Sequence, residues 1–162
     1  MKKIFYLLLS VLMPMMAHAY SLTRVSVHDP SIVWEPTSET YYIFGSHQAW
    51  AKSTDLMNWT SVAVNWGDGT NSNIDCSEAF NTQQVTTYTK GGTEYTFANF
   101  DAEAWSAIGN SSYDISGNLW AADVIYNEKM GKWCMYLSIN GDYANCSIVL
   151  LTADNIEGPY VY

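Results

Sequence analysis

Short apolar runs alternate with polar turns along most of the chain. The runs are rich in Val, Ile, Tyr and Trp, as in "SIVW", "YYIF" and "KWCMYLS", and Gly, Asn, Asp and Ser gather between them. This pattern predicts short β-strands. No stretch carries a convincing helical period, although residues 101–109 ("DAEAWSAIG") have room for one or two helical turns. The chain is predicted to be all-β, with strands at residues 26–34, 41–46, 50–53, 59–64, 119–127, 132–138, 146–151 and from 160 onward.

The first and last parts of this pattern resemble each other. "HDPSIVWEPTSETYYIFGS" followed by "AKSTDLMNW" aligns with "AADVIYNEKMGKWCMYLS" followed by "LLTADNIEGPY". Each copy begins with an Asp and runs through an apolar strand, so Asp29 and Asp123 occupy the same place in the two copies. Repeats of four short strands are typical of β-propeller blades. The polar segment between them, residues 65–97, is interpreted as the end of the first blade with an elaborated loop, and Gly91-Gly92 as a hairpin turn.

The N-terminus has the pattern of a secretory signal peptide. Lys2 and Lys3 precede the apolar run "IFYLLLSVLMPMMA", which ends at Ala17-His18-Ala19. A segment with a basic start, a short apolar core and an A-x-A site is a secretory signal peptide, which is removed in the mature protein. Residues 1–19 are therefore predicted to be removed near Ala19, leaving residues 20–162 as an exported protein, periplasmic or extracellular. The run is too short for a membrane span, which needs about 20 apolar residues.

Charge and composition narrow the choice of partner. The net charge of −9 becomes −11 once Lys2 and Lys3 are removed, so no basic patch exists to neutralise the phosphates of a nucleic acid. The charge is compatible with a neutral or a cationic ligand and does not choose between them. Aromatic residues make up 15% of the chain, which suits stacking on sugar rings and suits β-core packing equally well.

Three cysteines, Cys76, Cys134 and Cys146, match no zinc or CxxC spacing. Their odd number excludes complete intramolecular pairing. Cys134 lies in an apolar strand and is predicted to be a buried small side chain. A Cys134–Cys146 disulfide stays open as an alternative in an oxidising compartment.

The sequence His28-Asp29-Pro30 is unusual for a strand, because carboxylates and proline are poor strand formers. The innermost strand of a propeller blade has one free edge, where Pro30 is tolerated because not every N–H needs a partner. A polar side chain on that strand points towards the mouth of the central channel. Asp29 therefore combines a structural explanation with an opportunity for chemistry.

The set of motifs resembles glycoside hydrolase family 43, and within it the arabinan-degrading branch. The matching pieces are "VHDPSIVW", "YYIFGSH", "STDLMNW", "NLWAADVIYN" with "GKWCMYLS", and "IEGPY". They run in the family's order from Val27 to Tyr160. The resemblance implies a five-bladed β-propeller with the active site at one end of its channel. This chain then supplies roughly the first two blades, as the N-terminal part of a longer catalytic domain.

The resemblance also implies roles for two carboxylates. Asp29, in His-Asp-Pro-Ser, matches the general base that activates water. Asp123, in Trp-Ala-Ala-Asp-Val, matches the aspartate that tunes the pKa of the general acid and helps to orient the sugar. Ala122 departs from the family, which often has proline there. The general acid is a downstream glutamate. Glu128 and Glu157 do not match its motif, so this acid is expected outside the chain, and the chain alone is expected to be inactive.

Other residues are candidates for contacts with sugar. His28, Trp120 and Asn140 are predicted to bind substrate, with hydrogen bonding within the strands or burial between blades as the structural alternatives for the first two. His47 and Trp50 follow the second strand, where a loop has room to reach the site, but packing in the core is the favoured interpretation. In "STDLMNW", Asp55 is expected to cap a turn and Trp59 to pack between strands.

The function implied is an exported, inverting hydrolase of α-1,5-linked arabinan, acting on a polysaccharide or oligosaccharide of the arabinan or arabinoxylan type. An exo-acting α-L-arabinofuranosidase or β-xylosidase of the same family remains an alternative, and so does a non-catalytic carbohydrate-binding propeller. Nothing in these residues forms a calcium loop, so no metal ligand is predicted. The resemblance implies only that the complete propeller often carries calcium.

Overall fold

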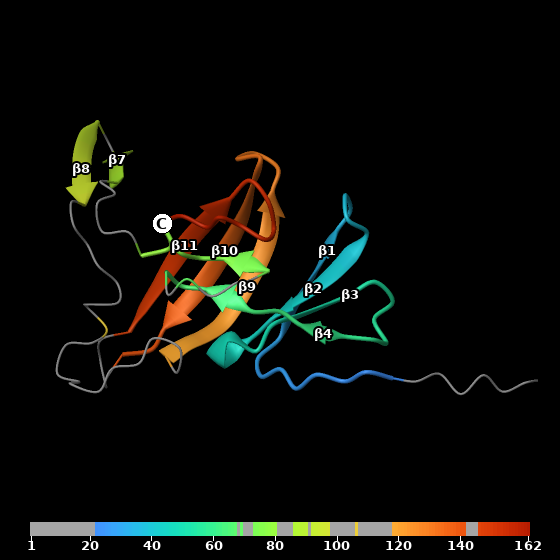
Figure 1. Ribbon diagram of the computed structural model, residues 1–162. Coiled ribbons are helices and arrows are strands. Elements are labelled where there is room, and N and C mark those ends of the chain that lie inside the picture. The colour runs from blue at the N-terminus through green and yellow to red at the C-terminus, as the bar shows by residue number, and fades with distance from the viewer. Residues whose placement is uncertain are drawn as a thin grey trace, which may run out of the picture.

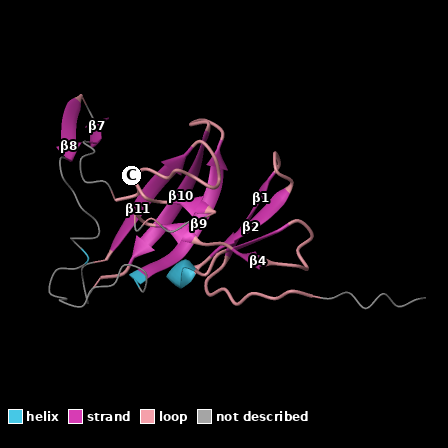
Figure 2. Ribbon diagram, viewed as in Figure 1, coloured by secondary structure: helices cyan, strands magenta, loops and turns pink. Residues whose placement is uncertain are grey.

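The computed structural model describes residues 22–67, 69, 73–80, 86–90, 92–97, 106, 118–141 and 146–162. The predicted signal peptide lies outside these residues, as does most of the 101–109 segment. The described part is built from β-strands, with one short 3-10 helix and single helical residues at Ser106 and Asn118. Figure 2 shows the strands and this helix by type.

The first part of the chain folds into a four-stranded antiparallel sheet in the order β1-β2-β3-β4. Its strands are β1 (Ser31–Glu35), β2 (Thr40–Phe44), β3 (Ala51–Ser53) and β4 (Thr60–Ser61). Helix η1 (Ser46–Gln48) follows β2. Two polar turns, at residues 36–39 and 54–58, reverse the chain at Pro36 and Asp55, as the alternation of apolar and polar residues predicted.

The predicted start of the first strand is wrong. We expected a strand from residue 26, but β1 begins at Ser31. Asp29 has a φ of 49°, which turns the chain out of an extended path, and Pro30 has no N–H to give to a neighbouring strand. Asp29 therefore lies in a bend just before the inner strand and not on it.

The last part of the chain forms a second antiparallel sheet in the order β11-β10-β9. Its strands are β9 (Leu119–Asn127), β10 (Lys132–Ile139) and β11 (Ser147–Ala153). A β-bulge interrupts the pairing of β9 with β10: Tyr136 pairs with Asp123, but Ser138 pairs with Trp120. Two residues of β9 thus face one residue of β10, as a bulge requires.

The two sheets share one apolar core, and β1 and β9 lie side by side (Figure 1). On the side of the first sheet, Phe44 of β2 and Trp50, directly before β3, are buried, with their rings edge-on at a centroid distance of 5.1 Å. In the second sheet Met135, Leu137 and Leu151 are buried. Burying side chains of this size contributes roughly 1.5–3 kcal/mol each, so the core fixes how the two inner strands meet.

A third set of contacts joins the middle of the chain to its last residues. Strands β5 (Val64–Asn65) and β6 (Ile74–Asp75) form a parallel pair. The backbone of Asp75 accepts from the Tyr160 N–H at 2.9 Å and donates to the Glu157 carbonyl at 2.8 Å. The expected strand from residue 160 is reduced to single bridges at Val161, with Thr152 and Glu78. Part of the segment assigned to the first blade is thus hydrogen bonded to the segment after β11.

The predicted hairpin is confirmed by the pairing of its two strands, while Gly91 lies outside the described residues. Strands β7 (Thr86–Lys90) and β8 (Thr93–Phe97) form an antiparallel hairpin in which Lys90 pairs with Thr93. Figure 1 draws this hairpin away from the two larger sheets.

The three cysteines are unpaired thiols in the structure. Cys76 and Cys134 are buried and Cys146 is exposed. Burial raises the pKa of the Cys76 thiol, with the nearby Asp75 charge adding to it. Cys134 is the buried side chain that its strand predicted, and the alternative disulfide to Cys146 is not formed.

Gly158 offers a test of the contact between β6 and the last residues. A Cβ at Gly158 would overlap the Asp75 carbonyl and lie 3.1 Å from the Tyr160 nitrogen, whereas a Cβ at Gly92 would meet nothing within 4 Å. Both glycines have positive φ, so Gly158→Ala and Gly92→Ala carry similar backbone strain. In chemical denaturation of the complete protein, the free energy of unfolding should fall by about 2 kcal/mol more in Gly158→Ala than in Gly92→Ala. Equal losses would contradict the close packing.

Candidate functional site

Asp29 lies in the bend before β1 with its side chain 46% exposed. Its Oδ2 accepts a hydrogen bond from the Ser46 hydroxyl at 2.9 Å and lies 2.7 Å from Nδ1 of His28. Both of these contacts are made by Oδ2 and neither by Oδ1. His28 therefore lies beside the candidate base, where the sequence placed it.

Ser46 begins η1, which is separated from β2 by Gly45, and is fully buried. Its backbone N–H donates to the His28 carbonyl at 2.9 Å. Its hydroxyl also accepts from the backbone N–H of Ala121, in β9, at 2.9 Å. Ser46 thus links the bend at Asp29 to the second sheet. Sequence reasoning missed this residue, although it ends the repeated aromatic-strand motif "YYIFGS".

Asp123 lies on β9 and is exposed. Its Oδ1 accepts a hydrogen bond of 2.6 Å from the hydroxyl of Ser31, the first residue of β1. This short, charge-assisted bond crosses from one sheet to the other. The sheets therefore bring the two predicted carboxylates, Asp29 and Asp123, to the same edge, where β1 and β9 run side by side. Ser31 was also missed as a site residue, although it follows Pro30 in the motif that carried the prediction.

Unusual backbone geometry gathers at this edge. Of the six non-glycine residues with positive φ in the described part of the chain, four lie here: Asp29 (49°), His47 (58°), Gln48 (57°) and Ala121 (49°). Each costs conformational energy that the surrounding packing must offset, and such residues cluster at functional sites. The geometry supports this edge as the candidate site independently of its charges.

Two aromatic side chains flank the carboxylates. Trp120 is 38% exposed, and its ring meets that of His47 edge-on with centroids 5.3 Å apart. The expectation that His47 packs in the core is wrong: its positive φ turns the side chain outward, next to Trp120. Trp50 is buried as expected, and its indole N–H donates to the Gly45 carbonyl at 2.8 Å. Trp120, His47 and His28 are the exposed rings described at this edge.

Asn140 follows β10 and lies at the same end of the second sheet as the start of β9. Its N–H donates to the Asn118 carbonyl at 2.8 Å, and its Oδ1 accepts from the Cys146 thiol at 3.1 Å. These contacts join it to its own sheet and not to Asp29 or Asp123. Its predicted contact with substrate stays a prediction.

The motif "STDLMNW" has the predicted turn. The Asp55 carboxylate accepts from the N–H groups of Met57 and Asn58 at 2.8 and 2.7 Å. Hydrogen bonds from Asn58, side chain first, hold the pKa of Asp55 well below its usual range. Trp59 is half-buried and donates its indole N–H to the Leu56 carbonyl.

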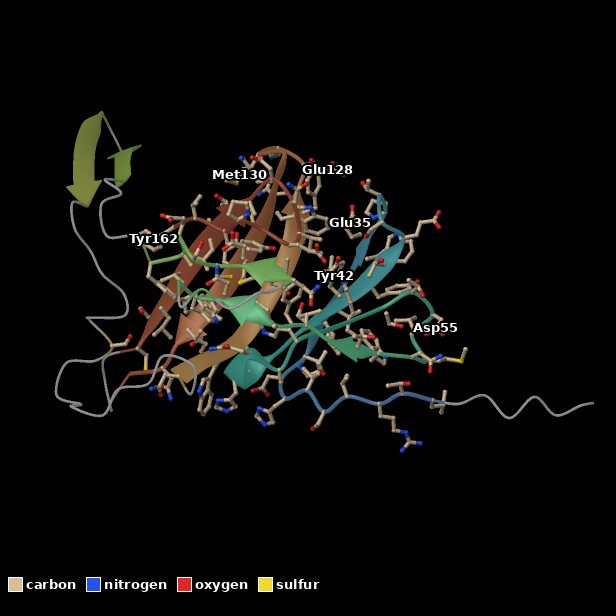
Figure 3. The ribbon with its side chains drawn as sticks, in the orientation of Figure 1. Glu35, Tyr42, Asp55, Glu128, Met130 and Tyr162 are labelled. Carbon is tan, nitrogen blue, oxygen red and sulfur yellow. The ribbon has the colours of Figure 1, made fainter. Side chains whose placement is uncertain are left out.

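A cleft of about 780 Å³ lies at the other end of the two sheets. It is lined by the β1–β2 turn, the end of β9 and the turn after β11. Figure 3 shows Glu35 and Tyr42 on the first-sheet side of the molecule and Glu128 at the β9–β10 turn. The Tyr42 hydroxyl donates to Glu157 at 2.8 Å, and burial together with that carboxylate raises the pKa of Tyr42. Neither Glu128 nor Glu157 belongs to the hydrogen-bond network of Asp29 and Asp123.

Glu35 in this cleft has a structural role. Burial alone would raise the pKa of its carboxyl, but hydrogen bonds from Ser38 and Thr37 outweigh burial and lower that pKa. The N–H groups of Thr37 and Ser38 reach the two carboxylate oxygens at 3.0 and 2.6 Å. Glu35 therefore closes the β1–β2 turn.

Within the described residues, no three His, Cys, Asp or Glu side chains gather closely enough to hold a metal ion. The same part of the chain contains no helix long and apolar enough to cross a membrane.

The chain was compared with known proteins in sequence and in structure. No protein-family model matches the chain. It is 36% identical over 138 residues to the extracellular endo-α-(1→5)-L-arabinanase 2 of Bacillus subtilis, covering 85% of this chain and 23% of that protein. The structure of the glycoside hydrolase family 43 protein YxiA from Bacillus licheniformis is 34% identical, with a TM-score of 0.50, over 87% of this chain and 25% of that one. The endo-1,5-α-L-arabinanase structure from Thermotoga petrophila is 25% identical, with a TM-score of 0.54, over 88% and 26%.

The chain thus spans about a quarter of the length of these proteins. The likeness in sequence and the likeness in structure agree on one family and cover the same large share of the chain. Over most of its length, this chain is similar to the arabinan-cleaving enzymes of glycoside hydrolase family 43.

Proposed function

We propose that the complete protein containing this chain is an exported glycoside hydrolase that cuts α-1,5-linked arabinan with inversion. The observation that carries the proposal is the pair of carboxylates, Asp29 in the bend before β1 and Asp123 on β9, which lie at one edge and are each held by a serine hydroxyl. The arabinanases to which the chain is similar support the substrate, and the word "extracellular" in the relatives' names supports export.

The proposed fold of the complete domain is a five-bladed β-propeller, of which this chain forms roughly two blades. The sequence repeat supports this, because it aligns Asp29 with Asp123, although in the structure Asp29 lies in the bend before β1 and Asp123 lies within β9. The second sheet also presents apolar side chains outward, Ile125, Tyr136 and Ile148, which are 43–77% exposed. A neighbouring blade packed on that face would cover them.

In the proposed mechanism Asp29 is the general base. Because Ser46 and His28 engage Oδ2, Oδ1 takes the proton from a water molecule. The oxygen of that water bonds to the anomeric carbon while the bond from that carbon to the leaving sugar oxygen breaks. A general acid from outside the described residues gives its proton to the leaving oxygen. Inverting hydrolases hold base and acid about 6.5–9.5 Å apart, which leaves room for the water.

Asp123 is assigned to the acid's pKa and to orienting the sugar. A nearby negative charge disfavours a second one, so it keeps the general acid protonated near neutral pH. Trp120 and His28, which lie beside the two carboxylates, and Asn140 are the proposed sugar contacts; Trp120 has an exposed ring for stacking. The described residues do not form a set that fits calcium, and no step of this mechanism passes through a metal.

Asp29→Asn tests the base. An amide cannot accept the proton of the attacking water, so kcat on linear arabinan should fall by roughly 100- to 10,000-fold, while binding of arabino-oligosaccharides measured by calorimetry stays close to that of the parent. Asp154→Asn is the matched control, because Asp154 is an exposed aspartate paired with Lys132 elsewhere in the fold. Hydrolysis by Asp29→Asn at the parental rate would show that Asp29 is not the base.

Asp123→Asn tests the second carboxylate. Removing its charge lowers the pKa of the general acid, so the acid loses its proton at lower pH and the basic limb of kcat/KM should move to lower pH. The pH profile of arabinan hydrolysis measures this, again with Asp154→Asn as control. A basic limb that stays in place would remove Asp123 from the assigned role.

A further inference from the structure

We propose that Ser46 is a positioning residue whose hydroxyl sets the orientation of the Asp29 carboxylate relative to the strand that carries Asp123. The inference rests on the proposed function, since it assigns Ser46 to the same reaction. Neither the sequence motifs nor the comparisons assign a role to this side chain.

The chemistry of a hydroxyl group fixes the direction of the two bonds. The Ala121 N–H can only donate, so the Ser46 oxygen is the acceptor of that 2.9 Å bond. The single hydroxyl hydrogen is then left for Oδ2 of Asp29, at 2.9 Å. Ser46 is 0% exposed, so bulk water does not reach it to replace either hydrogen bond. The result is a one-way chain from an amide through a hydroxyl to a carboxylate, in which each bond strengthens the next.

The donor of this chain comes from the β-bulge of β9. Because the bulge sets two residues against one on β10, Ala121 has a φ of 49° and its N–H points to Ser46 instead of along the ladder. Asp123 follows two residues later, so the same bulge also decides how its carboxylate leaves the strand. Ser46 therefore ties Asp29 to the element that aims Asp123.

Ser46 itself has little freedom to move. Its N–H is bonded to the His28 carbonyl at 2.9 Å. A Cβ on the preceding residue, Gly45, would overlap Val27 and lie 2.6 Å from the His28 carbonyl, so this segment packs directly on the residues before Asp29. The carbonyl of Gly45 accepts from the Trp50 indole. The hydroxyl is thus held by the backbone of the first sheet and by the bulge of the second.

Ser46→Ala in the complete protein should lower kcat on linear arabinan by about 10- to 100-fold, because a misplaced reacting group costs that much even when binding is intact. KM and the Kd for arabino-oligosaccharides should change less than threefold. Ser53→Ala is the matched control: Ser53 is a 4% exposed serine of the same sheet whose hydroxyl bonds to Asp55. This variant should lose thermal stability and keep its kcat.

Ser46→Thr separates positioning from packing. Threonine keeps the donor and the acceptor but adds a methyl group to a fully buried site, so Tm should fall while kcat stays within about threefold of the parent. Loss of kcat in proportion to loss of Tm across Ser46→Ala, Ser46→Thr and Ser53→Ala would overturn the inference, and so would Ser46→Ala with unchanged kcat.

A crystal structure of Ser46→Ala makes the outcome independent of activity. The Asp29 carboxylate should rotate away from the position in which the Ser46 hydroxyl holds it. An unchanged carboxylate would overturn the inference whatever the rates. Failure of the unaltered protein to hydrolyse arabinan would contradict the proposed function alone, because the orientation of Asp29 is still measured by the crystal structure.

Discussion

Apolar packing between two β-sheets is the interaction on which the site depends. Phe44 and Trp50 from the first sheet and Met135, Leu137 and Leu151 from the second belong to one buried cluster. Because this core joins the sheets, β1 and β9 meet side by side, although many residues separate them in the chain. Asp29 and Asp123 could not share a site without that contact.

Polar side chains gather at the edge of this core, where β1 and β9 lie side by side. The carboxylates of Asp29 and Asp123 are exposed enough to stay hydrated, which avoids the large cost of a buried charge. Each accepts a serine hydroxyl, and one of these serines, Ser46, is fully buried. Residues of positive φ surround the same edge. Stability is thus given up locally where geometry serves the proposed chemistry, and the core next to it offsets the loss.

The sequence predicted the features that follow from local pattern. Alternating apolar residues indicated the strands of both sheets, and the repeat placed Asp29 and Asp123 at equivalent positions. Features that depend on contacts between the sheets were not predictable. The hydrogen bond from the Ala121 N–H to the Ser46 hydroxyl joins two segments far apart in sequence, and the local sequence "FGSH" does not predict it. The bulge at Ala121 and the outward turn of His47 are backbone choices imposed by packing, with no glycine to mark them.

The most direct test of this account is a crystal structure of the complete protein, as the Asp29→Asn variant, with an arabino-oligosaccharide bound. The account predicts a sugar ring between residue 29 and Asp123, near the exposed ring of Trp120, with a water molecule next to the side chain of residue 29 on the face of the sugar opposite the leaving group. An oligosaccharide bound instead in the cleft beside Glu35 and Tyr42, with no sugar near Asp123, would contradict it.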